Sequence, residues 1–194
     1  FTLAHELGHA MHSYFSNKTQ SYPKAYYPIF LAEIASTTNE MLLINYLLKS
    51  TKDKNQRIAL YNKLFDEVKG TIYRQTMFAE FEEKVHKLYE DGESLTKDRL
   101  CGMYYVLNKK YFGEVKLIEQ IKFEWARIPH FFNAFYVFKY ATGMISAITF
   151  TNKILSHEEG AVEKYIKFLS AGCSDNPIKI LQSSGVDLLD EQTF

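Results

Sequence analysis

The sequence has 194 residues, enough for one domain or two small ones with a substantial buried core. Its composition, 46% hydrophobic and 24% charged, is ordinary for a soluble globular protein. The formal net charge is zero, so no broad field attracts nucleic acid or an anionic membrane, and neither is expected as a partner.

Helical periodicity dominates the sequence from its first residues. Leu3, Leu7, Met11 and Tyr14 recur every three to four residues and predict an apolar stripe on a first helix. Loop-forming residues follow over 16–27. Pro28 suits the first turn of a second helix, which is expected to continue to about Leu48.

The rest of the chain also favours helices. They are expected at 53–89 with Gly70 as a weak point, from a cap at Ser94 or Thr96 to Phe112, at 129–150 and at 157–169. A turn over 172–177 precedes a short final helix. Strict alternation is rare, so the predicted fold class is mainly α, with little or no sheet.

The cysteines indicate a reducing environment. Cys101 and Cys173 are isolated in sequence and have no zinc-knuckle or redox spacing. No apolar run is long enough to span a bilayer. These features favour a cytoplasmic location.

The first predicted helix carries the motif H-E-x-x-H. His5 and His9 lie one turn apart on nearly the same face, so both imidazoles can reach one cation. Glu6 lies about 100° around the helix from His5, where it can meet a water on the metal instead of competing as a ligand. The motif therefore predicts one catalytic Zn²⁺, with Glu6 as the general base that activates a zinc-bound water.

A catalytic zinc site needs a third protein ligand. Residues 10–32 contain no Asp or Glu, so Glu33 is the first carboxylate after the motif, and its apolar neighbourhood disfavours a solvated role. Glu33 is therefore the candidate ligand, with Glu40 behind it, two turns further along the same face. The extended metzincin motif fails, because Phe15 occupies the place of its third histidine.

His12 shares the face of the two motif histidines but lies about 10 Å along the axis from His5. That distance is too long for all three to bind one ion. A structural role is favoured over contact with substrate.

Five segments resemble oligoendopeptidase F of the thimet-oligopeptidase-like zinc metallopeptidases. They are HELGHAMHS at 5–13, FLAEIAST at 30–37, RIPHFF at 127–132, FYVFKYATG at 135–143 and SGVD at 184–187. The resemblance spans essentially the whole chain. It implies that residues 1–194 are the C-terminal catalytic domain of such an enzyme, that the substrates are short peptides, and that the N-terminal lobe of the same enzyme is a partner.

The resemblance also implies roles for individual residues. His5, His9 and Glu33 would hold zinc, and Glu6 would be the base. His130, Tyr136 and Tyr140 match the family's substrate-binding and oxyanion-stabilising residues.

The pattern of the second block alone agrees only in part with these roles. On a helix, Asn133, Tyr136, Tyr140 and Gly143 would share one face, with Gly143 permitting close approach. Phe131, Phe135 and Phe138 would share a core face. Without the resemblance, core packing is the favoured interpretation of the tyrosines too.

Two other functions fit parts of the pattern. Glu6-x-x-His9 and Glu83-x-x-His86 both have the E-x-x-H spacing of helical di-iron carboxylate proteins. That alternative leaves His5 unexplained, and the charge-dense surroundings of Glu83 are typical of a solvated face. The second alternative is a non-catalytic helical scaffold that retains the motif.

Overall fold

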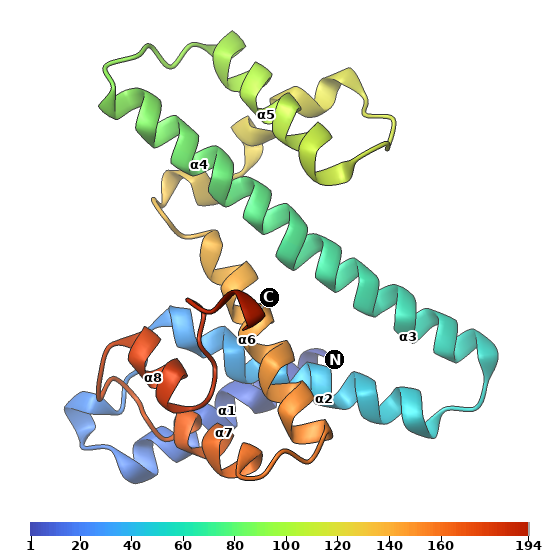
Figure 1. Cartoon of the computed structure of the whole chain (residues 1–194), viewed down its shortest axis with the longest axis vertical. Coiled ribbons are helices and arrows are strands. Elements are labelled where there is room, and N and C mark those ends of the chain that lie inside the picture. The colour runs from blue at the N-terminus through green and yellow to red at the C-terminus, as the bar shows by residue number, and fades with distance from the viewer. Residues whose placement is uncertain (194) are drawn as a thin grey trace. The chain divides into compact units, whose positions relative to one another are not determined.

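The structure is a computed structural model that describes residues 1–193 and contains two compact units (Figure 1). Unit 1 comprises Phe1–Glu67 and the chain from Thr142 onward, and unit 2 comprises Val68–Ala141. Over the described range the ordered elements are helices and turns without a strand, which confirms the mainly α prediction.

Unit 1 is built around two long helices that pack side by side, α1 (Thr2–Thr19) and α2 (Ile29–Ser50). A 3₁₀ turn at Tyr22–Lys24 lies in the loop between them. The other helical elements of unit 1 are α3 (Lys54–Glu67), most of α6 (Phe138–Leu155), α7 (Ala161–Leu169), α8 (Pro177–Ser183) and a 3₁₀ turn (Glu191–Thr193). Helix α7 contacts both α1 and α8 (Figure 1).

The core of unit 1 joins α2 to the C-terminal helices. Its buried side chains come from α2, α6, α7, α8 and the following loop, and they include Leu31, Ile34, Phe150, Phe168, Leu181 and Val186. Their removal from water supplies the main driving force for this packing. The core therefore fixes the part of α2 that carries Glu33, one of the residues expected to bind metal.

The predicted apolar stripe of α1 does not face this core. Leu3, Leu7 and Tyr14 are 74%, 51% and 58% exposed, and Met11 is exposed as well. The buried face of α1 instead carries Gly8, His12 and Ser16.

Gly8 explains how α1 approaches α2 so closely. A Cβ atom at position 8 would lie 2.5 Å from the Cα of Ser36 and 2.8 Å from the carbonyl oxygen of Ala35. Only glycine allows two backbones to meet at this distance. The amide of Asn39 adds a second tie, because it donates to the carbonyl oxygen of Ala4 at 2.6 Å.

Unit 2 contains α4 (Arg74–Glu90), α5 (Lys97–Phe112) and two 3₁₀ helices, Glu119–Arg127 and Pro129–Phe132. Thr96 caps α5 by accepting a hydrogen bond from the backbone N–H of Arg99, as predicted. Aromatic and aliphatic side chains from these elements form a separate core, which includes Met77, Phe78, Phe81, Tyr104, Leu107 and Val137.

The boundaries of several elements differ from the predicted ones. Helix α1 continues to Thr19, and Pro28 is the N-cap of α2 instead of its first helical residue. The weak point at Gly70 is a π-helical segment, Val68–Tyr73, between α3 and α4. Helix α7 begins at Ala161, because His157 and Gly160 have φ values of 58° and 73° that interrupt a right-handed helix.

The helix predicted over 129–150 is wrong in its first half. Pro129–Phe132 is a 3₁₀ turn, residues 133–137 are not helical, and α6 begins only at Phe138. Phe135 has a φ of 56°, which no α-helix accommodates. Asn133 and Tyr136 therefore share no helical face with Tyr140, and Phe135 and Phe138, both exposed, do not belong to a core face.

Candidate metal centre

Two helices of unit 1 bring three potential metal ligands together. His5 and His9 lie one turn apart on α1, and Glu33 lies in the second turn of α2. The Oε2 atom of Glu33 is 3.6 Å from Nε2 of His5 and 3.9 Å from Nε2 of His9. One donor atom from each side chain lies within 4.8 Å of the others, and all three side chains are partly exposed.

These donors fit a zinc ion. Zn²⁺ binds imidazole nitrogen and carboxylate oxygen at about 2.0–2.2 Å in a tetrahedron, which places the ligands about 3.3 Å apart. The two nitrogen–oxygen distances, 3.6 and 3.9 Å, are slightly longer than this value. Two neutral imidazoles and one carboxylate also leave a fourth position for water or substrate, as catalytic zinc sites require.

Glu40 orients the first of the two histidines. Its Oε1 atom lies 2.6 Å from Nδ1 of His5, so the Nδ1–H group donates to the carboxylate and Nε2 is left to face Glu33 and His9. Metal-binding histidines usually have such a partner on the ring nitrogen that does not bind the metal. The structure thus gives Glu40 the contact that was expected behind the ligands.

Ser36 and Tyr27 were not expected at this centre. The hydroxyl of Ser36 donates to the backbone carbonyl of Glu33 at 3.0 Å and contacts its Oε2 atom at 3.4 Å. The hydroxyl of Tyr27 lies 2.7 Å from Oγ of Ser13 and 3.5 Å from the carbonyl oxygen of His9. Serine and tyrosine lack a distinctive sequence pattern, so only the structure identifies these contacts.

Glu6, the residue after His5 on α1, is exposed. It is not among the three donors that meet at the metal centre. This placement is what a base beside the metal requires, because the carboxylate stays available to a water molecule.

His12 is fully buried and lies outside the ligand cluster. Its ring stacks on Tyr27 with centroids 3.6 Å apart and an interplanar angle of 7°. Burial lowers the pKa of His12 to about 3, with a smaller contribution from His9, so the ring is neutral at pH 7. These contacts agree with the structural role predicted for it.

Gly143 faces Glu33 without a tight contact. A Cβ atom there would lie 3.9 Å from the Cβ of Glu33, an ordinary van der Waals distance. The glycine that this centre requires is Gly8.

His130, Tyr136 and Tyr140 form a cluster within unit 2. The hydroxyl of Tyr140 lies 3.2 Å from Nε2 of His130, and the Tyr136 ring stacks on the imidazole with centroids 5.5 Å apart. The two tyrosine rings meet edge to face at 5.6 Å. All three side chains are half-buried.

Glu82 supports the loop that carries Tyr136. Its carboxylate is only 5% exposed and accepts a hydrogen bond from the backbone N–H of Phe135 at 2.7 Å. The His86 ring lies against the Phe135 ring at a tilt of 32°, with centroids 4.6 Å apart. The charge-dense segment was interpreted as a solvated face, which holds for the exposed Glu83 but not for Glu82.

The di-iron alternative requires a second metal-binding E-x-x-H pair, formed by Glu83 and His86. Within residues 1–193, the one group of three or more ligand-type side chains close enough for a metal is His5, His9 and Glu33. Glu83 and His86 belong to no such group in this part of the chain.

Comparison with known proteins assigns the chain to a family. The profile of peptidase family M3 matches residues 1–194, the whole sequence. The chain belongs to peptidase family M3. The solved structure of oligoendopeptidase-F from Enterococcus faecium superposes with a TM-score of 0.89 and 45% identity, covering 99% of this chain and 35% of that one.

Two curated relatives are similar over nearly the same region. Oligopeptidase PepF of Bacillus subtilis is 49% identical over 97% of this chain, and the plasmid-encoded oligoendopeptidase F of Lactococcus lactis is 47% identical over 97%. The chain spans 28% and 31% of the length of these two relatives. No helix in the described part of this M3 chain is both long and apolar enough to cross a membrane.

Proposed function

We propose that this chain is the catalytic domain of a zinc metalloendopeptidase that hydrolyses short peptides. The observation that carries the proposal is the meeting of His5, His9 and Glu33, with Glu40 bonded to the far nitrogen of His5. The relatives named as oligopeptidases and oligoendopeptidases support the substrate class.

His5, His9 and Glu33 would hold one zinc ion. When bound there, zinc acts as a Lewis acid on a peptide carbonyl and makes water more acidic. Glu40 keeps the Nδ1–H tautomer of His5, so that Nε2 presents its lone pair to the metal.

Glu6 is the proposed general base. It takes the proton from the water that attacks the peptide carbonyl and returns it to the leaving amine. Its exposure and its position outside the donor set support this role.

His130, Tyr136 and Tyr140 are proposed to bind substrate and to stabilise the oxyanion. This assignment rests on the match of 127–132 and 135–143 to the family pattern, together with the cluster that the three side chains form. A phenolic O–H aimed at the developing negative charge stabilises the transition state more than the substrate.

The N-terminal lobe of the enzyme is the proposed partner of this chain. The chain spans less than a third of its two curated relatives, and α1 exposes Leu3, Leu7, Met11 and Tyr14 on one face. A contiguous exposed apolar face of this kind marks a site of protein contact. The family resemblance implies that this lobe forms one wall of the substrate channel, which would orient the scissile bond. We therefore expect the chain alone to cleave peptides slowly or not at all.

A cytoplasmic location is part of the proposal. Both cysteines are free thiols, Cys101 buried and Cys173 exposed, which suits a reducing compartment.

The test is hydrolysis of an internally quenched short peptide by the zinc-loaded chain, with and without chelator. Wild type supplemented with the N-terminal portion of a relative should cleave the peptide, whereas Glu6→Gln under the same conditions should bind zinc but lose hydrolysis. Zinc binding with no chelator-sensitive cleavage, even after addition of the N-terminal portion of a relative, would support the non-catalytic scaffold instead.

A further inference from the structure

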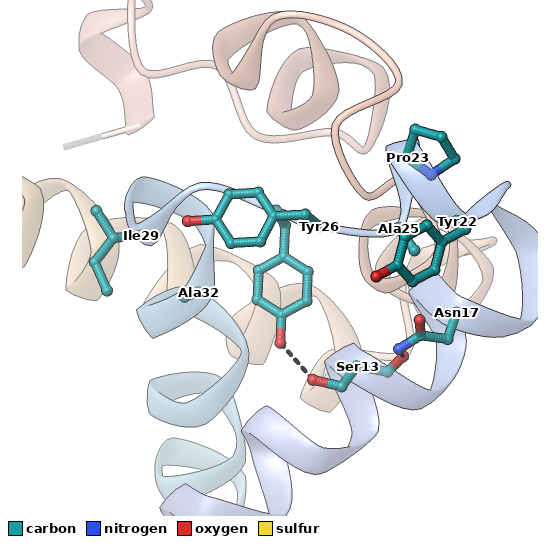
Figure 2. A pocket seen from close by; sticks show the side chains of 9 residues that line it. Ser13, Asn17, Tyr22, Pro23, Ala25, Tyr26, Ile29 and Ala32 are labelled. Carbon is teal, nitrogen blue, oxygen red and sulfur yellow. Dashed lines mark hydrogen bonds between the residues drawn. The ribbon is translucent and has the colours of Figure 1, made fainter.

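A cavity of about 670 Å³ lies in unit 1, and its lining includes Ala32, the residue before Glu33 on α2 (Figure 2). Its walls come from α1, from the loop that follows α1, and from the first turn of α2. Ser13 and Asn17 line it on α1, and Ile29 and Ala32 line it on α2. The two helices that border the cavity are therefore the two that carry His9 and Glu33.

Two lining residues of the cavity share one face of α1 with Glu6. Ser13 and Asn17 follow Glu6 by seven and eleven residues. At about 100° per residue, each lies within about 20° of Glu6 around the helix axis. A molecule that contacts Glu6 can therefore continue along the same face of α1 into the cavity.

The spacing along α1 between His9 and the cavity-lining Ser13 suits a peptide. Ser13 is four residues after His9, or about 6 Å along the helix axis. An extended peptide advances about 3.3 Å per residue. A side chain in the cavity would thus belong to a residue about two positions from the bond that is cleaved.

The lining favours a neutral apolar side chain. Tyr22, Tyr26 and Tyr27 supply aromatic surface, and Ile29 adds an aliphatic wall (Figure 2). None of the nine lining residues is charged, so neither a basic nor an acidic side chain would find an ionic partner there. Aromatic rings also accept another ring in offset or edge-to-face contact.

Hydrogen bonds hold this cavity in shape. The hydroxyl of Ser16 donates to the carbonyl oxygen of Ala25 at 2.6 Å. The backbone N–H of Cys173 donates to the carbonyl oxygen of Lys24 at 2.9 Å. Tyr27 is fixed by its bond to Ser13 and by stacking on the buried His12. Binding therefore needs little ordering of the loop, which favours affinity.

We infer that this cavity is a substrate subsite for an aromatic or large aliphatic side chain about two residues from the scissile bond. The inference rests on the proposed peptidase function. It adds a determinant of specificity, formed by the segment from Ser13 to Ala32, that is separate from the metal ligands.

The test measures binding without turnover. The probes are blocked hexapeptides of alanine and glycine in which one phenylalanine is moved through each position, and the parent peptide of the same composition without phenylalanine. Binding to the zinc-loaded Glu6→Gln chain is followed by NMR. The best phenylalanine peptide should bind at least about tenfold more tightly than its parent and should shift the signals of Tyr22, Tyr26 and Ile29.

Two variants and one control locate the binding. Asn17→Trp fills the cavity from an exposed position, and Tyr22→Ala removes a wall that is 95% exposed, so neither should disturb folding. Both should remove most of the preference for phenylalanine. Tyr46→Ala is the matched control, because Tyr46 is 67% exposed on α2 and does not line the cavity.

The possible outcomes separate this inference from the proposed function. A phenylalanine peptide that binds no better than its parent, or that keeps its advantage in Asn17→Trp and Tyr22→Ala, would overturn the subsite. Binding that depends on Asn17 and Tyr22 in a chain that never hydrolyses peptides would support the cavity and contradict the peptidase.

Discussion

The Nδ1 atom of His5 lies 2.6 Å from a carboxylate oxygen of Glu40, two turns of α2 beyond Glu33. Removal of this partner frees the imidazole to rotate and to change tautomer, so Glu40→Ala should weaken zinc binding about 10- to 100-fold. Glu33→Ala should weaken it more, because it removes a ligand. Competition with a zinc-sensitive dye measures both, with Glu83→Ala as the exposed control. Equal losses in the Glu33 and Glu40 variants would contradict this ranking.

Gly8 and Gly143 provide a matched pair of glycine-to-alanine substitutions near the metal centre. Gly8→Ala forces α1 away from Ser36 and should destabilise unit 1 by about 1–3 kcal/mol or more, with loss of zinc affinity. Gly143→Ala has room for its methyl group and should be neutral or up to about 1 kcal/mol more stable, since alanine favours a helix. Urea unfolding measures both, and a stable Gly8→Ala chain with normal zinc affinity would refute the close-approach argument.

The sequence pointed to the three side chains that meet at the candidate metal centre, because most of their pattern is local. His5 and His9 need only one helical turn, and the apolar neighbours of Glu33 singled it out among the acids. The closeness of α1 and α2 depends instead on the fit of Gly8 against Ser36, which periodicity does not encode.

The aromatic segment shows where periodicity failed. The spacing of Tyr136 and Tyr140 suits a helix, but tertiary contacts overrode that preference at Phe135. Glu82, which lies in the charge-dense segment around Glu83, accepts a hydrogen bond from the backbone N–H of that residue, 53 positions away. Such long-range contacts have no local signature. The spacing of the apolar residues on α1 likewise predicted their common face. It did not predict that this face is exposed in unit 1.

Tyr140→Phe tests the proposed oxyanion role. The substitution removes one O–H group and keeps the ring, so the contact with Tyr136 should survive. Loss of one oxyanion donor typically lowers kcat about 10²- to 10³-fold, and the change in KM should be smaller. Steady-state kinetics with a quenched peptide measures both constants. A folded Tyr140→Phe enzyme with the wild-type kcat would return this tyrosine to a packing role.

His12 should make the stability of unit 1 depend on pH. Its pKa is lowered to about 3 by burial, so between about pH 6.5 and 3 the unfolded chain binds a proton that the folded chain does not. The contribution of His12 to the free energy of unfolding is therefore fully present above about pH 6.5. It is lost as the pH falls from about 6.5 to 3. Between pH 7.5 and 5 the loss should be about 2 kcal/mol.

His12→Phe keeps a ring beside Tyr27 but cannot take up a proton. Urea unfolding of metal-free wild type and His12→Phe at the two pH values isolates the contribution of His12, because the other histidines titrate in both proteins. An identical pH dependence of the two proteins would contradict the buried neutral state of His12.

The most direct test of the metal centre is anomalous diffraction at the zinc edge from crystals of the zinc-loaded chain. One zinc peak is expected, with Nε2 of His5 and His9 at about 2.0–2.1 Å and the Glu33 carboxylate at about 2.0–2.2 Å. Zinc bound away from these three side chains, or two metal peaks instead of one, would contradict the account.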